Sequence, residues 1–208
     1  MSSSAPATDP VATRGRGRPR SVAADEAILE ATRAVLAEDG WAALTVEGVA
    51  ARAGVAKTTV YRRFSSRADL AVAAVAQLVA AARTAPGSGA AEDISNAIRA
   101  CADVYSRPAA RAAYLAVVAE AGRDPALRAA VEGRVITPAR QIVADGLDRA
   151  VAQGEITREL ADSRLDLLYD VLAGALLHRV LVRVAEVDDD FIETLTSAVL
   201  VALRMPVC

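Results

Sequence analysis

Residues 45–70, TVEGVAARAGVAKTTVYRRFSSRADL, decide the fold of this chain. They predict two short helices joined by a tight turn and followed by the start of a third helix. Ala50 is small enough for the first two helices to cross closely, and Gly54 stands where the turn needs a positive φ, which glycine adopts at little cost. Val60 and Phe64 lie one helical turn apart and can anchor the second helix in a core. The spacing is that of a helix-turn-helix.

The ends of these helices carry capping residues. Thr45 is the expected N-cap of the first helix, with Glu47 in its first turn. The second helix is expected over residues 57–64. Ser66 is the expected N-cap of the third helix, and Asp69 three residues later completes a Ser-x-x-Asp capping box. Local signals therefore define where the first and the third of these helices begin.

The composition predicts an all-α protein. Of the 208 residues, 53% are hydrophobic but only 3% are aromatic, and the apolar positions are mostly Ala, Val and Leu at helical spacing. The length allows one large domain or two small ones. We expect a disordered Arg- and Gly-rich arm over residues 1–21, a helix-turn-helix domain over residues 22–70 and a larger helical domain over residues 71–208.

Prolines, glycines and apolar periodicity divide the rest of the chain into helices. Gly40 is expected to end the first helix. Pro138 falls inside a helical pattern and should kink or split that helix, because it cannot donate to the carbonyl of Arg134. The expected helices outside the central motif are residues 23–39, 67–83, 91–105, 108–121, 125–153, 160–185 and 188–204.

The distribution of charge indicates a nucleic-acid partner. The net charge is only −2, but basic residues gather in two stretches that contain no acidic residue. The first stretch contains Arg14, Arg16, Arg18 and Arg20. The second, between residues 48 and 67, contains Arg52, Lys57, Arg62, Arg63 and Arg67. A local basic surface on an otherwise acidic protein suits binding to phosphate.

Cysteine usage and hydropathy point to the cytoplasm. Cys101 and Cys208 are far apart in sequence and have no metal-ligand spacing, which is typical of a reduced cytosolic protein. The N-terminus lacks the apolar segment of a secretory signal. The apolar stretch at residues 171–177 is too short to span a membrane. We therefore expect a cytoplasmic protein without a membrane partner.

The helix expected over residues 57–64 has a polar face suited to the major groove of duplex DNA. Lys57 and Arg62 can donate to guanine or to phosphate. Thr58 can touch a thymine methyl group, and the Tyr61 hydroxyl suits a phosphate oxygen. The alternative is the ordinary solvated face of a small helix.

The string GVAKTTVYRRFSSR, residues 54–67, resembles the signature of the TetR/AcrR family of bacterial transcriptional regulators. The resemblance implies an α-helical dimer in which an N-terminal DNA-binding domain is coupled to a larger regulatory domain. The family's DNA-contacting positions correspond here to Thr45, Lys57, Thr58, Thr59, Tyr61, Arg63 and Arg67. This chain departs from the family pattern at Ala56, where a capping Ser is frequent, and at Glu47 and Gly48, in a stretch that often carries a polar or basic contact.

The N-terminal basic run alternates arginine with glycine. Narrow A·T-rich minor grooves concentrate negative potential and attract arginine. We therefore expect an arm that becomes ordered on DNA, as in many members of the family, with Arg14, Arg16, Arg18 and Arg20 as its contacts. The alternative is a solubilising tail.

The resemblance also implies that the last two long helices pair with those of a second chain. The apolar residues expected at this dimer interface are Leu168, Leu172, Ala175, Leu176, Leu195 and Val199, unless both stripes face only their own core. The residues expected to line an effector pocket are Tyr105, Tyr114, Tyr169 and His178. Buried tyrosines are common in any core, and a lone histidine has the alternative of a core or interface position.

Two functions fit this sequence. The first is a ligand-responsive repressor, a homodimer on a pseudo-palindromic operator that an apolar small molecule releases from DNA. The second is a DNA-binding dimer without an effector, controlled by a protein partner or constitutive. A closed apolar cavity favours the first and a filled core the second. No enzyme, cofactor or metal site is expected, because the chain has one histidine, no Gly-rich phosphate loop and no Ser/His/Asp spacing.

Overall fold

The computed structural model describes residues 22–83 and 85–204, and within these ranges it contains helices and no strand. The all-α prediction is therefore confirmed. The first helices are α1 (Val22–Glu38), α2 (Gly40–Ala43), α3 (Val46–Arg52), α4 (Lys57–Tyr61) and α5 (Arg67–Ala81). The later elements are α6 (Ala90–Tyr105), α7 (Pro108–Ala121), α8 (Pro125–Val131), α9 (Thr137–Ala152), α10 (Arg158–Leu177) and α11 (Asp189–Arg204), with two π-helical turns, η1 (Glu132–Ile136) and η2 (His178–Val182).

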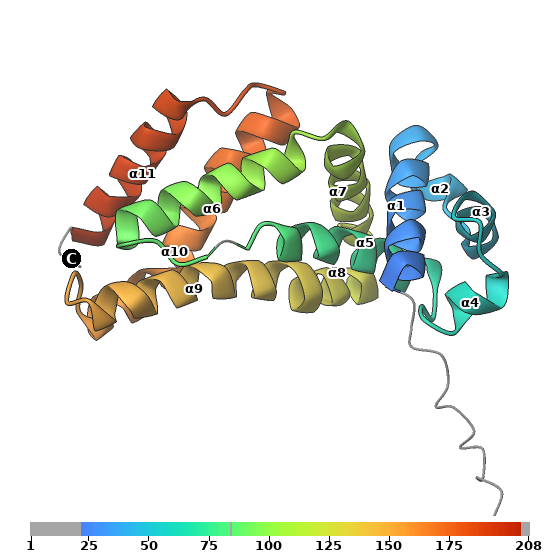
Figure 1. Cartoon of the computed structure of the whole chain (residues 1–208), viewed down its shortest axis with the longest axis horizontal. Helices are drawn as coiled ribbons and strands as arrows, with labels where there is room; N and C mark the ends of the chain where they lie inside the picture. Colours follow the sequence, from blue (N-terminus) through green and yellow to red (C-terminus); the bar gives the residue numbers. More distant parts are fainter. Residues whose placement is uncertain (1–21, 84, 205–208) are drawn as a thin grey trace, which may run out of the picture.

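The first four helices lie together at one end of the molecule, and α5 leads from them into the remaining helices (Figure 1). α1 packs against α3, α5 and α7, so this end is joined to the rest by more than the chain connection. At the other end, α6 contacts α9, α10 and α11. α5 touches elements of both ends and is the structural link between them. None of the described helices is long and apolar enough to cross a membrane.

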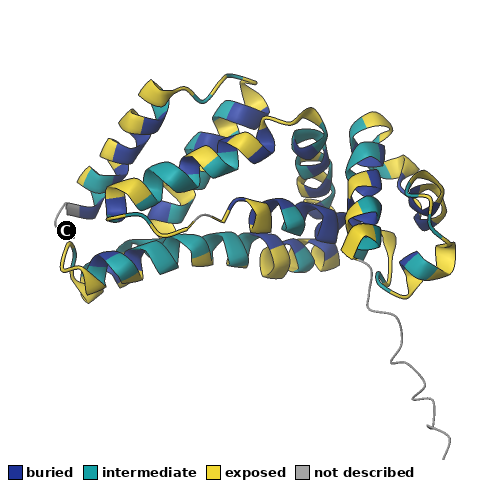
Figure 2. Ribbon diagram, viewed as in Figure 1, coloured by how far each residue is buried: buried dark blue, intermediate teal, exposed yellow. Residues whose placement is uncertain are grey.

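The buried apolar side chains form two hydrophobic cores, and Figure 2 marks the buried residues along the ribbon. The first core joins α1, α3, α4 and α5 to the inner faces of α7, α8 and η1, and it contains Ile28, Val49 and Val60, each 0% exposed. The second core lies mainly between α6, α9, α10 and α11. α5 contributes Leu70 to the first core and Leu78 to the second. Burial of each such side chain stabilises the fold by about 1.5–3 kcal/mol.

Two of the expected helix N-caps are confirmed. The Thr45 hydroxyl accepts a hydrogen bond from the N–H of Gly48 at 3.0 Å, and the Ser66 hydroxyl accepts one from the N–H of Asp69 at 3.0 Å. The capping box differs in one respect, because the Asp69 carboxylate accepts from the N–H of Ser65 at 2.8 Å rather than from that of Ser66. α5 is thus capped as predicted, with the return bond shifted by one residue.

Gly40 ends α1 as predicted, but an unpredicted helix follows it, and the end of α4 differs from the prediction. Gly40 has a φ of +75°, but the chain turns there directly into the short helix α2. A single left-handed residue ends the hydrogen-bond ladder of α1 without preventing the next turn from being helical. α4 is regular only as far as Tyr61, and the N–H groups of Arg63 and Phe64 both bond to the carbonyl of Val60 in the turn that follows.

The helix expected over residues 125–153 is divided just before Pro138, as predicted. The backbone forms η1 there, and the N–H of Thr137 bonds to the carbonyl of Glu132, five residues back. A π-helical turn of this kind accommodates the hydrogen bond that proline cannot make. The sequence carries no comparable signal for η2, which was not predicted. The helix expected to reach residue 185 changes to η2 after Leu177 and ends at Val182.

Candidate nucleic-acid interface

The turn between α3 and α4 holds one face of α4 against the first core. Gly54 has a φ of +66°, and the N–H of Val55 bonds to the carbonyl of Ala50 at 3.0 Å, which closes the turn. Ala50 is 1% exposed and Val60 is 0% exposed, so both side chains are in the core. The space around Gly54 is open, which shows that the positive φ rather than crowding requires glycine there. The predicted helix-turn-helix geometry is therefore present.

The opposite face of α4 is exposed at the outer end of the molecule (Figure 2). Lys57, Thr58, Tyr61 and Arg62 are exposed, and Thr59 is half-buried. Ammonium and guanidinium groups donate to phosphate oxygens and to the O6 and N7 atoms of guanine, and hydroxyl groups bond to either. α4 and its C-cap residue Arg62 thus present to solvent several hydrogen-bond donors that can bond to acceptor atoms of duplex DNA.

Two further predicted contact residues flank α4. Thr45, the N-cap of α3, and Arg67, the first residue of α5, are both exposed. The guanidinium carbon of Arg67 lies 5.5 Å from the centroid of the Trp41 ring, a cation–π contact that limits its freedom. The arm with Arg14, Arg16, Arg18 and Arg20 lies outside the described residues.

Arg63 is placed differently from the other predicted contact residues. Its guanidinium pairs with the carboxylate of Asp25 on α1 and donates to the carbonyl of Thr59 at 3.2 Å. Its side chain is only 9% exposed. The structure therefore corrects the expected surface position of Arg63, because the pair with Asp25 draws the side chain inward and fastens the end of α4 to α1.

One acidic side chain lies within this basic surface. The Tyr61 hydroxyl donates to the Glu47 carboxylate at 3.1 Å and so bridges α4 and α3. A backbone hydrogen bond within Glu47 and the bond from Tyr61 lower the pKa of Glu47, which is therefore ionised near neutral pH. A contact between the Tyr61 hydroxyl proton and phosphate requires this bond to break. Sequence reasoning missed the pair because its two members come from different helices.

An ion pair joins the start of α5 to the C-terminal helices. The guanidinium of Arg134, in η1, pairs with the carboxylate of Asp69, which also accepts the N–H of Ser65. Burial raises the pKa of Asp69, but the hydrogen bonds from Ser65 and the charge of Arg134 outweigh it and hold the pKa below its usual value. Ser65 follows the turn that ends α4. Through Asp69 and Ser65, the pair thus connects η1 to the segment that directly follows α4.

An apolar cavity of about 100 Å³ lies among α5, α6, α7, α9 and α10. Tyr105, Tyr114 and Tyr169 line it with Cys101 and aliphatic side chains. The rings of Tyr105 and Tyr114 meet edge to face, with centroids 5.2 Å apart. The structure thus brings three of the four expected pocket residues together. The fourth, His178, is exposed in η2 and is not part of the lining, which corrects its expected position.

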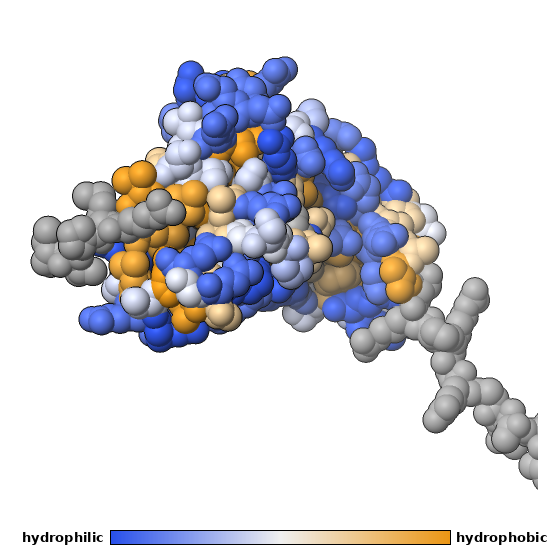
Figure 3. Space-filling model, turned by 60° about the vertical axis from the view of Figure 1, so that its left-hand side comes forward, coloured by the Kyte–Doolittle hydropathy of each residue, from blue (hydrophilic) through white to orange (hydrophobic). Residues whose placement is uncertain are grey.

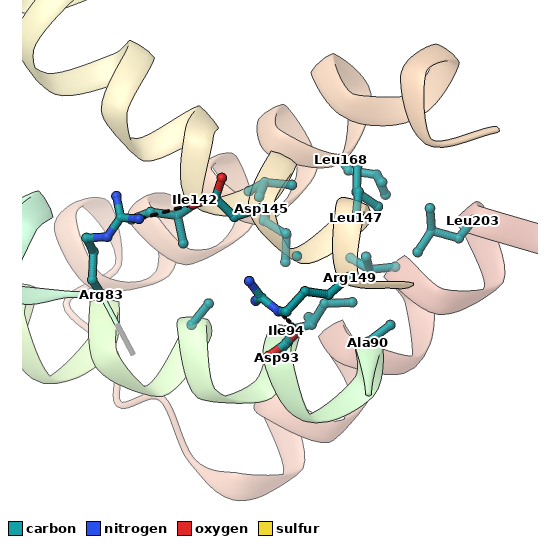
Figure 4. A pocket seen from close by; sticks show the side chains of 15 residues that line it. Arg83, Ala90, Asp93, Ile94, Ile142, Asp145, Leu147, Arg149, Leu168 and Leu203 are labelled. Carbon is teal, nitrogen blue, oxygen red and sulfur yellow. Dashed lines mark hydrogen bonds and ion pairs between the residues drawn. The ribbon is translucent and has the colours of Figure 1, made fainter. Parts of the chain in front are cut away.

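A second cavity, of about 90 Å³, is drawn in Figure 4, and its lining overlaps that of the first. Four aliphatic residues line both cavities: Ala97, Ile142, Val143 and Leu172. The charged side chains of the second cavity form two ion pairs. Arg83 donates to Asp145 at 3.0 Å, and Arg149 donates to Asp93 at 2.9 Å. The two cavities therefore share a thin wall but differ in polarity.

The apolar residues expected at a dimer interface mostly face their own core. The four that are buried in the second core are Leu168, Leu176, Leu195 and Val199, between 1% and 7% exposed. Leu172 lines both cavities, and Ala175 is half-buried. The expected interface is corrected accordingly, because a buried side chain has no surface left for a second chain. Periodicity shows that a helix has an apolar stripe but not what covers it.

Other apolar residues of α10 and α11 are exposed. Leu167 and Val171 are 47% and 38% exposed on α10, and Val201 is 60% exposed on α11. Gly174 is exposed, with open space around it. Leu167, Val171 and Gly174 lie four and three residues apart, which places them on one helix face. Figure 3 shows hydrophobic surface gathered at the end of the molecule where α11 finishes.

Two family models match most of the described chain. Residues 28–74 match the model described as bacterial regulatory proteins, tetR family. Residues 87–199, more than half of the chain, match the model described as Tetracyclin repressor-like, C-terminal domain.

Relatives and solved structures agree with these matches. An uncharacterised HTH-type transcriptional regulator of Mycobacterium tuberculosis is 29% identical over 175 residues, which cover 83% of this chain and 84% of the relative. The DNA-binding transcriptional repressor TetR of Mycobacteroides abscessus is 29% identical over 200 residues, covering 92% and 97%. The crystal structure of the TetR family transcription regulator SCO0332 matches with a TM-score of 0.65 and 28% identity, covering 89% of this chain and 98% of that one. The exposed basic helix, the helical fold and the family models lead to one conclusion: the chain belongs to the TetR family of DNA-binding transcriptional regulators.

Proposed function

We propose that this protein represses transcription as a homodimer on a pseudo-palindromic operator and that a small molecule in its C-terminal domain releases it from DNA. Residues 22–70 act as the DNA-binding domain, and residues 71–208 bind the effector and form the dimer. The observation that supports this most is the placement of α4, which Val60 anchors in the core while Lys57 and Arg62 face solvent. The similar protein of Mycobacteroides abscessus is named a repressor.

In this proposal α4 enters the major groove. Lys57 and Arg62 donate to guanine or phosphate, and Thr58 and Thr59 contact base edges or the backbone. Thr45, Tyr61 and Arg67 bind phosphates around the groove. Arg63 acts as a positioning residue through Asp25, and the arginines of the N-terminal arm enter the adjacent minor groove.

The exposed face of α10 supports the proposed homodimer. Leu167, Val171 and Gly174 form an apolar strip with one residue small enough for close helix packing. α11 adds Val201 at its end. A two-fold axis through such a face sets the two α4 helices in successive major grooves, about 34 Å apart or a multiple of that distance.

The proposed ligand acts on DNA binding through η1. Val135 of η1 lines the apolar cavity, and its neighbour Arg134 pairs with Asp69 at the start of α5. A ligand that displaces Val135 moves Arg134 and with it the support of α4 at Ser65. If the ligand prefers the displaced state, the two α4 helices become misspaced and affinity for the operator falls.

The alternative function is a DNA-binding dimer without a small-molecule effector. The cavity volume of about 100 Å³ favours it, because ligand pockets commonly measure about 300–1,000 Å³. The lining by three tyrosines from different helices favours the ligand-responsive protein instead.

Footprinting of the full-length protein on the upstream region of its own gene tests the DNA-binding part of the proposal. Two protected half-sites with centres about 10 base pairs apart, or a multiple of that spacing, are the expected result. A single protected half-site, or uniform protection without symmetry, contradicts the dimer on a pseudo-palindrome.

A further inference from the structure

The lining of the two cavities indicates what kind of molecule the C-terminal domain accepts. We propose that the effector is a neutral, compact, mainly apolar molecule with one oxygen atom that hydrogen-bonds to the hydroxyl groups of Tyr105, Tyr114 or Tyr169. This inference rests on the proposed ligand response but concerns the chemistry of the ligand rather than its effect on DNA.

The three tyrosine hydroxyls are available to a ligand. Tyr105, Tyr114 and Tyr169 reach the cavity from α6, α7 and α10. Among the described residues, none makes a hydrogen bond with these hydroxyls. A tyrosine hydroxyl in a protein interior usually has a hydrogen-bond partner. Three that lack one beside a single cavity form a set of donors for a ligand oxygen.

The apolar cavity offers no charge to a ligand. Burial raises the pKa of Cys101 to about 11 and that of Tyr169 to about 12, and it also raises the pKa of Tyr105 and Tyr114. All four side chains are therefore neutral near pH 7. The described residues of the lining include no Asp, Glu, His, Lys or Arg. A charged ligand would lose its hydration here without gaining an opposite charge, at a large cost in free energy.

The adjoining cavity also disfavours a charged ligand, although it contains charged groups. Figure 4 shows Arg83 directed at Asp145 and Arg149 directed at Asp93. Asp93 additionally accepts the N–H of Gly87 at 2.7 Å. Two positive and two negative groups cancel, and an ionic ligand would have to break one of the existing pairs. Both cavities therefore select for a neutral molecule.

The volumes limit the size of the ligand. The cavities measure about 100 and 90 Å³, of the same order as the roughly 150 Å³ that accommodates benzene in an engineered protein cavity. Each therefore accommodates a molecule no larger than about one ring. Ile142 and Leu172 stand between them, and a rotamer change of either would join the two spaces for a slightly longer molecule.

Four one-ring probes test the inference by direct binding to the full-length protein without DNA: toluene, benzyl alcohol, benzoate and benzylammonium. Ligand-observed NMR titrations give their affinities. Benzyl alcohol is expected to bind at least about tenfold more tightly than benzoate or benzylammonium, because neither cavity has a free counter-charge. A charged probe that binds as tightly as benzyl alcohol overturns the inference, as does a failure of both neutral probes to bind.

Tyrosine-to-phenylalanine variants locate the hydrogen bond. At least one of the variants Tyr105→Phe, Tyr114→Phe and Tyr169→Phe should weaken the binding of benzyl alcohol by about three- to tenfold and leave the binding of toluene unchanged. Tyr61→Phe is the matched control for probe binding alone, since Tyr61 belongs to the proposed DNA-binding surface on α4; it should change the affinity of neither probe. Equal effects on the two probes throughout the series, or no effect in any variant, would overturn the inference.

A substitution that fills the cavity provides a second, independent test. Leu172→Phe puts a larger side chain into the wall between the cavities and should abolish binding of both neutral probes. If the variant still binds them, the probes bind elsewhere, which contradicts the inference.

A mobility-shift assay then separates this inference from the proposed function. If benzyl alcohol binds as expected but saturating amounts leave the operator complex intact, the ligand response fails while the assignment of ligand chemistry stands.

Discussion

The two ends of the molecule are held together by different kinds of interaction. Around α3 and α4 the structure depends on bonds between near neighbours in sequence, such as the Thr45 cap on Gly48 and the turn at Gly54. At the other end it depends on contacts between distant residues, such as the ion pair of Arg149 with Asp93. Local bonds fix a small rigid surface, whereas distant packing leaves room for cavities. The contrast suits a fixed DNA-binding surface and, in the proposed function, an adaptable interior that binds the ligand.

In the proposed dimer, the exposed face of α10 is the part of the adaptable end on which DNA binding should depend most. Val171→Glu places a carboxylate at the centre of this face, where two-fold symmetry brings two such charges together. We expect the dimer to dissociate and operator affinity to fall by about a hundredfold or more, because each half-site is then bound separately. Analytical ultracentrifugation and DNA titration measure the two effects.

Val118→Glu is the matched control for this change, since Val118 is 42% exposed on α7 and is not part of the exposed face of α10. It should leave both the mass of the particle and its affinity for DNA unaltered. A Val171→Glu protein that stays dimeric would show that the chains pair through another surface.

The rigid end is tested by removing two charges from α4. Replacing both Lys57 and Arg62 by glutamine should lower operator affinity by at least about 30-fold, because each good contact to a base edge is worth about 1–3 kcal/mol and two are lost. The slope of log affinity against log salt concentration should become shallower by about one for each phosphate group that the variant no longer neutralises. Fluorescence anisotropy over a range of salt concentrations measures both quantities.

Arg99→Gln is the control for these substitutions, because Arg99 is an exposed arginine paired with Asp189 at the far end of the molecule. It alters net charge without touching α4. If Arg99→Gln and the α4 variants weaken binding equally, the effect arises from total charge, and α4 is not the reading helix.

How far sequence predicts structure differs between the two ends. The caps at Thr45 and Ser66 and the turn at Gly54 follow from residues a few positions apart, so their geometry is predictable one residue at a time. The pair between Asp25 and Arg63 is not predictable in this way, because it needs the relative position of two helices. The exposed face of α4 is therefore easier to predict than the side chain that fastens its end.

At the adaptable end, periodicity predicts helices but not their neighbours. It places an apolar stripe containing Leu168 on α10, but only the packed structure shows that α10 turns this stripe inward and exposes Leu167 instead. Three of the predicted pocket tyrosines meet at one cavity, although their spacing in sequence gives no reason for it. Contacts between distant residues decide both results.

The Asp25–Arg63 pair gives a test of how the rigid surface is supported. Asp25→Asn should destabilise the protein by about 1–2 kcal/mol, less than the full cost of breaking a buried pair because the Asp25 side chain is 37% exposed. Operator affinity should fall by about three- to tenfold as the end of α4 loosens. Thermal unfolding and DNA titration provide the measurements.

The sign of the change in affinity distinguishes two roles for Arg63. If Arg63 itself contacted DNA, removal of its acidic partner would free the guanidinium and strengthen binding. A weaker complex supports a positioning role, and a stronger one contradicts it. Glu26→Gln, at the exposed neighbouring position on α1, is the control and should alter neither stability nor affinity appreciably.

The smallest expected effect comes from Glu47, the acidic residue on the basic surface. Glu47→Gln removes a negative charge that lies beside Lys57 and holds the Tyr61 hydroxyl. Operator affinity should rise by about two- to fivefold, as expected for an exposed charge, and the gain should shrink as salt increases. Glu193→Gln, on the exposed side of α11, serves as the control.

The pH dependence of this gain follows from the direction of the pKa shift. Because the pKa of Glu47 is lowered in the folded protein, its carboxylate stays ionised across the neutral range and takes up a proton only at acid pH. The ratio of the two affinities should therefore be constant between about pH 6 and 8. A ratio that falls towards one by about pH 6 would show that Glu47 is protonated there. A weaker Glu47→Gln complex would show that the Glu47 carboxylate supports the reading helix and does not merely oppose phosphate binding.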